Sequence, residues 1–343
     1  MADAPRFLLV RLDGLGDALA CIPALEGLRN AHPGAAFGAI CSPSNASVFS
    51  RRVQHVHVCD TATHADALGT ELRAIGYTHA LVATEEVVGY GLARASGAPR
   101  RSGFWHRFEK PFKSLWQYAQ LTDAVYRPAA WTARPEHESV ALYRLALPFG
   151  ALLPAPDDSR RLREWLAIDA SDGASTAHEA LGFQIAGKLS AGGWGPAALA
   201  ALCGATVRAS GLRVLTLLAA PSDQGLALAV LEQLDADVRL HATLVPAASL
   251  PRWLHDLDSL AALVTPDTGA AHAAGMLGVP VIDLFAQERF EQLSRQWRPW
   301  AAPAVCIVKP AAAESVPQQF GAQIGAQIPG LCARDPRTRT LAR

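Results

Sequence analysis

The sequence carries no excess of either charge, because 31 lysine and arginine residues balance 31 aspartate and glutamate residues over 343 positions. A protein that wraps a nucleic acid normally has a basic excess, so a polyanion would have to bind a local patch here. Long apolar runs are missing as well, and none approaches the roughly 20 residues of a membrane-spanning helix. The opening MADAPRF has no signal-peptide pattern. We therefore expect a cytoplasmic protein whose membrane contact is at most peripheral.

Cysteine is sparse and is never paired at metal-site spacing. The six residues lie mostly among apolar neighbours, which is typical of reduced core residues, and nothing suggests a zinc or iron site. They are Cys21, Cys41, Cys59, Cys203, Cys306 and Cys332. With 50% hydrophobic and 18% charged residues, the chain fits a globular protein long enough for two ordinary domains.

Short apolar runs alternate with helix-period segments almost throughout, a pattern typical of βαβ units on a parallel sheet. The expected strands of a first series are FLLVRL, AAFGAIC, VHV near residue 56, and HALVAT. Those of a second series cover 181–187, 213–220, 237–242, 260–266 and 279–285.

Prolines and charges interrupt the alternation at about residues 147–161, as an interdomain linker would. We expect an α/β protein of two facing Rossmann-like domains with a cleft between them. The predicted boundaries are 1–150 for the N-terminal domain, 151–178 for the linker region and 179–343 for the C-terminal domain. Ligands of such sheets bind at the carboxyl ends of the strands.

The segment LVTPDTGAAHAAGMLGVPVIDLF predicts an anion site. A strand ends near Thr265, a turn follows, and a helix of small residues ends at Gly278. Four backbone N–H groups, those of residues 268–271, are expected to be free at the helix start, where the helix dipole favours a phosphate. In the alternative interpretation, Asp267 only caps the helix and His272 is a core histidine.

The opening segment RLDGLGDALACIPAL places Asp13 and Asp17 where a buried strand turns into a helix. An aspartate at this position can cap the helix or do chemistry. The segment alone leaves both interpretations open.

Together the two motifs resemble glycosyltransferase family 9, the bacterial heptosyltransferases. Members begin with a strand, a loop ending in Gly-Asp and a helix with Pro-Ala-Leu, and they carry Asp-Thr-Gly-x-x-His followed by Leu-Gly-Val-Pro-Val. The match runs coarsely from residue 6 to about 300. It implies an inverting enzyme of the GT-B architecture, in which a terminal helix often crosses back to the first domain. The segment after about residue 311 is expected to supply that helix.

The resemblance assigns roles by position. Asp17 falls on the catalytic base, which removes the acceptor hydroxyl proton, and Asp13 is left as a loop or cap residue. For Asp223, a ribose-binding role and a helix cap remain equal alternatives. The donor-binding residues implied by position are Asp223, Asp267, Thr268, Gly269, Ala270 and His272. Lys188 is added as a candidate that could reach the same phosphate, with an exposed loop lysine as the equal alternative.

Two loops depart from the family pattern. Many members have a diphosphate-binding lysine two residues before a tryptophan, but AGKLSAGGW has Gly192 there, with Lys188 earlier in the loop. The loop after VIDLF reads AQERFEQ instead of the usual Gly-Pro-Thr. Both departures leave the identity of the donor sugar open.

The segment RRSGFWHRFEKPFKSLW, residues 100–116, interleaves basic and aromatic residues on an otherwise neutral protein. The acceptor of the family is the acidic, phosphorylated inner core of lipopolysaccharide, which such a segment could bind. The implied acceptor-binding residues are Arg101, His106, Arg107 and Lys110. In the alternative interpretation the aromatics are core and the charges a solvated face.

The resemblance thus implies heptose transfer from ADP-heptose to a lipopolysaccharide-core acceptor, with no nucleic acid as partner. No metal cofactor is required, although Mg²⁺ on the diphosphate stays open. One alternative is a GT-B glycosyltransferase with another donor. A second alternative is a non-catalytic protein that binds nucleotide sugars or assists assembly.

Overall fold

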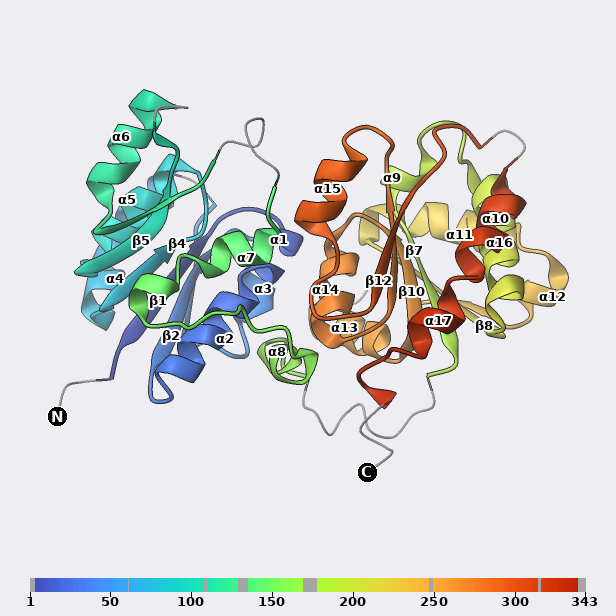
Figure 1. The fold of residues 1–343 in the computed structure, drawn as a ribbon, viewed down its shortest axis with the longest axis horizontal. Coiled ribbons are helices and arrows are strands. Elements are labelled where there is room, and N and C mark those ends of the chain that lie inside the picture. Colours follow the sequence, from blue (N-terminus) through green and yellow to red (C-terminus); the bar gives the residue numbers. More distant parts are fainter. Residues whose placement is uncertain are drawn as a thin grey trace. The chain divides into compact units, whose positions relative to one another are not determined.

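The computed structural model describes residues 4–60, 62–107, 110–128, 135–168, 178–246, 249–313 and 316–338. For residues 62–67 it describes the backbone only. The chain divides into two compact units. The first unit comprises Met1–Asp157 with Trp165–Ala167, and the second comprises Asp158–Glu164 with Ile168–Arg343. Each unit is a parallel sheet covered by helices (Figure 1). The α/β class expected from the sequence is therefore confirmed.

The sheet of the first unit has the order β3-β2-β1-β4-β5-β6, and all its neighbouring strands are parallel. Its strands are β1 (Arg6–Arg11), β2 (Ala36–Cys41), β3 (His55–Val58), β4 (His79–Val82), β5 (Arg100–Trp105) and β6 (Asp123–Tyr126). The direction of the strand order reverses between β1 and β4. Such a reversal is where ligands bind in doubly wound sheets, outside the carboxyl ends of the strands.

Helices of the first unit connect these strands. They are α1 (Leu15–Leu19), α2 (Ile22–Ala31), α3 (Ala46–Phe49), α4 (Ala62–Ile75), α5 (Val87–Ala95), α6 (Pro111–Gln120) and α7 (Glu138–Tyr143), followed by a short 3₁₀ turn, Leu147–Phe149. The next helix, α8 (Ser159–Trp165), lies within the span predicted as a linker. Proline at the start of α2 and α6 favours a helix beginning there, because its fixed φ suits the first turn and its missing N–H costs nothing.

The second unit repeats the same topology. Its sheet has the order β12-β11-β10-β7-β8-β9, so the reversal falls between β7 and β10. The strands are β7 (Ala180–Ile185), β8 (Val214–Ala219), β9 (Ala242–Leu244), β10 (Leu260–Pro266), β11 (Val281–Phe285) and β12 (Ala304–Val308). Two sheets with one topology give two equivalent ligand-binding edges.

The helices of the second unit follow in chain order. They are α9 (Gly187–Ser190), α10 (Pro196–Ser210), a 3₁₀ turn (Pro221–Asp223), α11 (Gln224–Glu232), α12 (Ala236–Arg239), α13 (Leu250–Asp258), α14 (Gly269–Leu277), α15 (Phe290–Trp297), α16 (Pro317–Gly325) and α17 (Ile328–Cys332). None of the described helices is both long and apolar enough to cross a bilayer.

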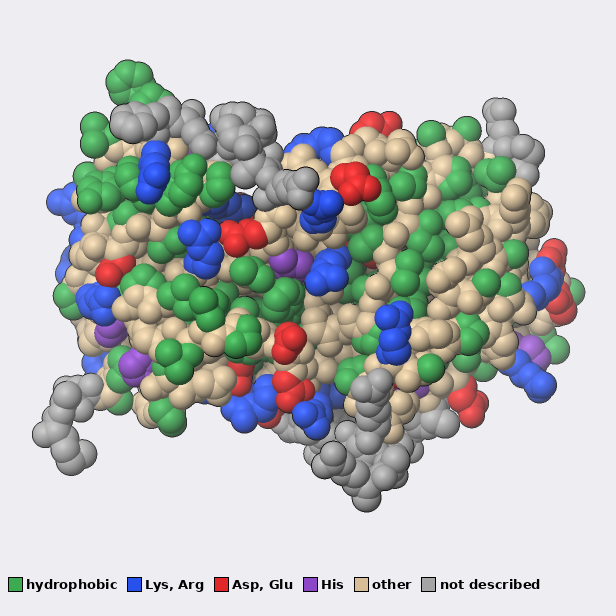
Figure 2. All heavy atoms as spheres, in the orientation of Figure 1, with side chains coloured by type: hydrophobic (Ala, Val, Ile, Leu, Met, Phe, Trp, Pro, Cys, Tyr) green, Lys and Arg blue, Asp and Glu red, His purple; other side chains and the backbone are tan. Residues whose placement is uncertain are grey.

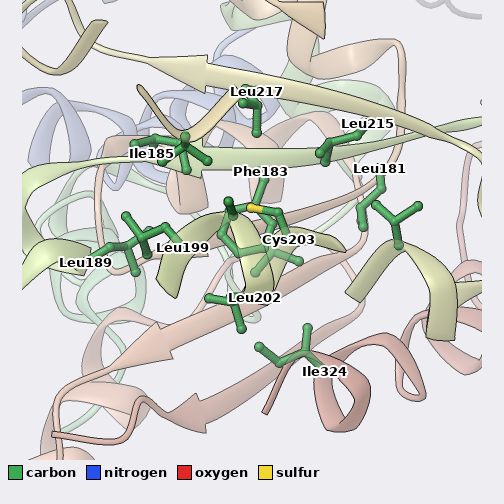
Figure 3. Packing of buried hydrophobic residues seen from close by; sticks show 14 of the residues in the cluster. Leu181, Phe183, Ile185, Leu189, Leu199, Leu202, Cys203, Leu215, Leu217 and Ile324 are labelled. Atoms are coloured by element: carbon green, nitrogen blue, oxygen red, sulfur yellow. The ribbon is translucent and has the colours of Figure 1, made fainter. Parts of the chain in front are cut away.

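The core of the second unit forms between one face of the sheet and α10. Alternate residues of β7, from Leu181 to Ile185, point to the same face and are fully buried, as Figure 3 shows. Leu199 and Leu202 of α10 meet them, and Ile324 of α16 adds a further layer. Each such side chain contributes about 1.5–3 kcal/mol by leaving water.

Most expected strands are present within a residue or two of their predicted limits. The expected strand over 237–242 is wrong, because those residues form most of α12 and β9 starts only at Ala242. Strands β5, β6 and β12 were not predicted. β6 and β12 are edge strands and only partly buried, and β5 (RRSGFW) and β6 (DAVY) lack the continuous apolar run that marks β1 or β10. β12 has such a run, AVCIV, so its sequence did carry a strand signal.

The C-terminal helices belong to the second unit. Helix α16 packs along α10, and α17 contacts β10. We expected the terminal helix to cross back to the first domain; the described residues instead place both helices in the second unit.

Glycines allow α16 to approach α10 closely, which gives a stability prediction. A Cβ on Gly325 would lie 2.5 Å from the carbonyl oxygen of Thr206 and 2.6 Å from the Cβ of Ala209. We expect Gly325→Ala to lower the free energy of unfolding by about 1–3 kcal/mol, measured by urea denaturation. Gly330→Ala on α17 is the control, because nothing lies within 4 Å of its added Cβ. Equal stability of the two variants would contradict this account of the α10–α16 contact.

Candidate active site

Arg11 organises the carboxyl edge of the first sheet. It is the last residue of β1 and its side chain is buried between two aspartates, with Nη2 2.6 Å from Oδ1 of Asp17 and Nε 3.1 Å from Oδ2 of Asp13. Its Nη1 also donates to the carbonyl oxygen of Ala83, the first residue after β4. The guanidinium thus joins the two strands that flank the reversal of strand order.

The Asp17 carboxylate caps the start of α1 and is also partly exposed to solvent. It lies in the first turn of α1, where its Oδ2 accepts a hydrogen bond of 3.2 Å from the N–H of Gly14. The other oxygen pairs with Arg11, and 31% of the side chain stays exposed. Asp17 therefore does cap the helix, as one interpretation of the sequence predicts. Its carboxylate can still accept a hydrogen bond from a substrate, since a carboxylate accepts about four hydrogen bonds.

A second charged cluster lies after β4, β5 and β6. Glu85 faces Nε2 of His106 at 3.2 Å, Nζ of Lys110 at 3.3 Å and Nε of Arg127 at 3.9 Å. The hydrogen bond from His106, followed by the nearby positive charges, lowers the pKa of Glu85 to about 2 despite its partial burial. Arg127 also binds Glu138 through two hydrogen bonds of 3.0 and 2.7 Å.

Three of the four predicted acceptor-binding residues gather near this cluster. His106 and Lys110 contact Glu85, and the exposed guanidinium of Arg107 lies 4.3 Å from the ring centroid of Tyr126. Arg101 does not join them, which corrects the prediction. It stands near the amino end of β5 and donates to the carbonyl oxygens of Ala98 and Gln120, both at 2.7 Å.

The predicted donor residues of the second unit meet at the ends of β7, β8 and β10. Nζ of Lys188, on α9 after β7, donates to the carbonyl oxygen of Asp267 at 2.5 Å and lies 3.9 Å from its Oδ2. Asp223 follows β8, and its Oδ1 lies 3.6 Å from the position that a Cβ on Gly187 would take. Three residues far apart in sequence thus share one edge of the sheet.

The start of α14 has fewer free backbone N–H groups than the sequence predicts. Thr268, not Asp267, is the N-cap, and its Oγ1 accepts from the N–H of Ala270 at 3.3 Å. The N–H of Ala271 donates to the carbonyl oxygen of Thr268 at 3.0 Å. Within the part of the chain that the structure describes, no hydrogen bond is assigned to the N–H groups of Thr268 and Gly269, so two donors remain where four were expected.

Two buried groups lie beside this helix start. His272 is one turn into α14, is 6% exposed and packs edge-on against Trp297 at 5.6 Å, as the core-histidine alternative predicts. Asp283 of β11 is fully buried, and no hydrogen-bond partner for either carboxyl oxygen is found among the described residues. Burial, and then the charge of Asp267, raise the pKa of Asp283 well above its usual range, which favours a neutral carboxyl.

The absence of a lysine at position 192 has a structural cause. Gly192 has a φ of +74°, and a Cβ there would lie 1.6 Å from the carbonyl oxygen of Ala311. The carbonyl of Gly192 accepts from the N–H of Ala313 at 3.0 Å, and the indole of Trp194 donates to Pro310 at 3.0 Å. The backbone of the 310–313 segment occupies the space that a side chain at 192 would need.

Sequence reasoning missed the arginines and glutamates that hold these edges together. Arg11, Glu85, Arg127 and Glu138 became visible only when the strands were placed side by side. For Arg11 a signal existed, since a charged residue directly after FLLV needs a partner when buried. In the described residues, no cluster of three or more His, Cys, Asp or Glu side chains could hold a metal ion.

Two parallel six-stranded sheets of one topology, each covered by helices, form an α/β fold of the GT-B type. The model of glycosyltransferase family 9 (heptosyltransferase) matches residues 65–319, most of the chain, and the chain belongs to this family. The protein is therefore a glycosyltransferase. The matched span contains the donor residues, while Asp17 lies before it. No curated protein sequence matches the chain.

Solved structures share the fold at low sequence identity. Heptosyltransferase WaaC of E. coli with ADP has a TM-score of 0.71 and 18% identity, covering 94% of this chain and 99% of that one. A family 9 glycosyl transferase from Veillonella parvula DSM 2008 has a TM-score of 0.67 and 17% identity, covering 97% of each chain. The ADP-heptose lps heptosyltransferase II of E. coli has a TM-score of 0.67 and 16% identity, covering 96% and 98%.

The crowding at Gly192 yields a prediction for restoring the family lysine. We expect Gly192→Lys to destabilise the second unit rather than add a phosphate ligand. Gly193→Lys is the matched control, because it adds the same charge at a φ of +77° but meets nothing within 4 Å. Both variants carry the cost of a positive φ, about 1–2 kcal/mol, and Gly192→Lys should lose roughly 1–3 kcal/mol more by overpacking. Urea denaturation measures the difference; equal losses would show that the neighbouring segment yields freely.

Proposed function

We propose that this glycosyltransferase transfers heptose from ADP-heptose to an acceptor of the lipopolysaccharide-core type. The observation that carries the proposal is the edge of β7 and β10, where an exposed lysine and a helix start converge. Related folds support the choice of donor, since WaaC has been solved with ADP and with ADP-2-deoxy-2-fluoro heptose. At these identities the relatives establish the fold, and the donor for this chain is our proposal.

The donor diphosphate is proposed to bind at the start of α14. The N–H groups of Thr268 and Gly269 and the helix dipole favour an anion there. Lys188 is 64% exposed and reaches this point from α9, so its ammonium can move from the carbonyl of Asp267 to a phosphate oxygen. Asp223, whose carboxylate lies beside Gly187, is proposed to accept hydrogen bonds from ribose hydroxyls.

The proposed reaction is a single displacement with inversion. An acceptor hydroxyl oxygen forms a bond to the anomeric carbon, its proton passes to the carboxylate of Asp17, and the bond from that carbon to the diphosphate oxygen breaks. The electron pair leaves with ADP, whose negative charge Lys188 and the α14 N–H groups stabilise. Arg11 fixes the orientation of the Asp17 carboxylate through its 2.6 Å contact. Mg²⁺ on the diphosphate would supply further charge stabilisation.

The acceptor is proposed to bind the first unit through the exposed Arg107 and the partly exposed Lys110. Arg107 and Lys110 stand beside the Glu85 cluster, and guanidinium and ammonium groups suit phosphorylated sugars. The buried His106 is proposed to position Lys110 through Glu85 rather than touch the acceptor. A different donor sugar remains the second candidate, favoured by the AQERFEQ loop, in which Arg289 takes a φ of +61° directly before α15.

The donor proposal predicts selective nucleotide binding. Calorimetry with ADP, ADP-heptose, UDP and UDP-glucose should show the adenine nucleotides binding most tightly. Gly269→Val should weaken ADP binding by roughly tenfold or more, because a branched side chain blocks the approach of phosphate to the helix start. Gly330→Val, on an open face of α17, is the control for folding. Equal ADP affinity of Gly269→Val and the wild type would contradict the proposed diphosphate site. Tighter binding of UDP than of ADP would favour another donor.

The proposed role of Asp17 as catalytic base predicts that its replacement lowers turnover without weakening donor binding. Asp17→Asn keeps the size and can still accept from Gly14 but removes the basicity, so kcat should fall by roughly 10²- to 10⁴-fold while ADP affinity stays near the wild-type value. Asp13→Asn is the matched control, because Asp13 pairs with the same Arg11 side chain. Transfer to the acceptor is the required assay, since donor hydrolysis can proceed without the base. Wild-type turnover in Asp17→Asn would leave Asp17 with its capping role alone.

A further inference from the structure

Helix α6 of the first unit has its polar side turned inward and its apolar side turned outward. Ser114, Gln117 and Gln120 are buried at the i, i+3, i+6 spacing of one helix face. The other face exposes four large apolar or aromatic side chains, namely Phe112 (91%), Leu115 (72%), Tyr118 (52%) and Trp116 (38%). Figure 2 shows hydrophobic side chains gathered on the surface over α6. A soluble helix normally has the opposite arrangement.

Hydrogen bonds fix the helix in this orientation. The N–H of His106 donates to Oγ of Ser114 at 3.1 Å, and Nη1 of Arg94 donates to Oε1 of Gln120 at 3.1 Å. Nε of Arg101 donates to the main-chain carbonyl of Gln120 at 2.7 Å, which holds the C-terminal end. Rotating α6 to bury Phe112 and Leu115 would break the first two of these bonds. The exposed apolar face is therefore a consequence of the packing of the unit.

The apolar face is accompanied by positive charge. Lys113 lies on α6 and the exposed Arg107 precedes the helix, while α6 itself contains no acidic residue. Lys110, the N-cap, is paired with Glu85. The two aromatic side chains Trp116 and Tyr118 have rings that pack on Tyr90 and Trp105. Aromatic rings with a polar end, apolar side chains and lysines together are the composition of helices that lie in a membrane interface.

We propose that α6 docks the protein on an anionic lipid bilayer, with Phe112 and Leu115 entering the interface and Lys113 binding lipid headgroups. A second copy of the chain suits the face less well. A symmetric pair would bring the same lysine and arginine side chains of both copies together, and like charges across an interface are unfavourable. The inference goes beyond the proposed function and holds whichever sugar is transferred.

Vesicle flotation tests the docking directly, without any transfer assay. The full chain should bind vesicles of phosphatidylcholine and phosphatidylglycerol at 3:1, and bind pure phosphatidylcholine vesicles more weakly. The double variant Phe112→Ser, Leu115→Ser should lose roughly tenfold or more in vesicle affinity, because two exposed apolar side chains no longer enter the interface. Leu240→Ser is the matched control, because Leu240 is 79% exposed in the second unit and should leave binding unchanged.

A charge variant and a size measurement complete the test. Lys113→Gln should weaken binding to the anionic vesicles by roughly fivefold and hardly change binding to neutral ones. Circular dichroism and ADP binding of each variant confirm that the fold is retained. The proposal is overturned if the double variant binds anionic vesicles like the wild type. It is also overturned if the chain ignores vesicles and instead forms a dimer, seen by light scattering, that the double variant abolishes.

Discussion

The reversal of strand order in each sheet is the constraint on which the candidate site depends. In both units the first three strands extend the sheet toward one edge and the next three extend it toward the other edge. The first and fourth strands are therefore neighbours at the centre. At each reversal a cation at or shortly after the end of the first strand donates to the carbonyl of the residue after the fourth strand. Arg11 reaches Ala83 in the first unit, and Lys188 reaches Asp267 in the second. Both units therefore join the two central strands at their carboxyl ends by a hydrogen bond from a cationic side chain to a main-chain carbonyl.

The two cations differ in burial, and this difference gives them different chemistry. Arg11 is buried and held by two carboxylates and a carbonyl, so its guanidinium orients a neighbour and has little freedom to meet a ligand. Lys188 is exposed, and its ammonium is held mainly by one carbonyl oxygen, so a phosphate can replace that partner at little cost. One edge is therefore suited to fix a carboxylate, and the other to bind an anion.

Sequence patterns predicted the parts that depend on local order. Buried strands such as β1 and β10 are continuous apolar runs, and Gly278 marks the end of α14 because a φ of +83° suits glycine. The interactions among distant segments were not predictable in this way. The Glu85 cluster needs β4, β5 and β6 in register. At α14 the N–H of Ala270 is taken by the side chain of Thr268, and the N–H of Ala271 by the main-chain carbonyl of Thr268. Arg101 was misplaced because its strand, β5, went unrecognised.

Net neutrality of the sequence conceals how charge is distributed over the first unit. His106 connects two features that composition cannot show: its ring faces Glu85, and its backbone N–H holds Ser114 on the inner face of α6. Because one buried residue fixes both, the position of the apolar face of α6 is tied to the charged cluster at the carboxyl edge of the sheet. A change that loosens His106 would disturb the cluster and the helix together. The burial of a histidine between these elements therefore has a structural purpose even without contact to a substrate.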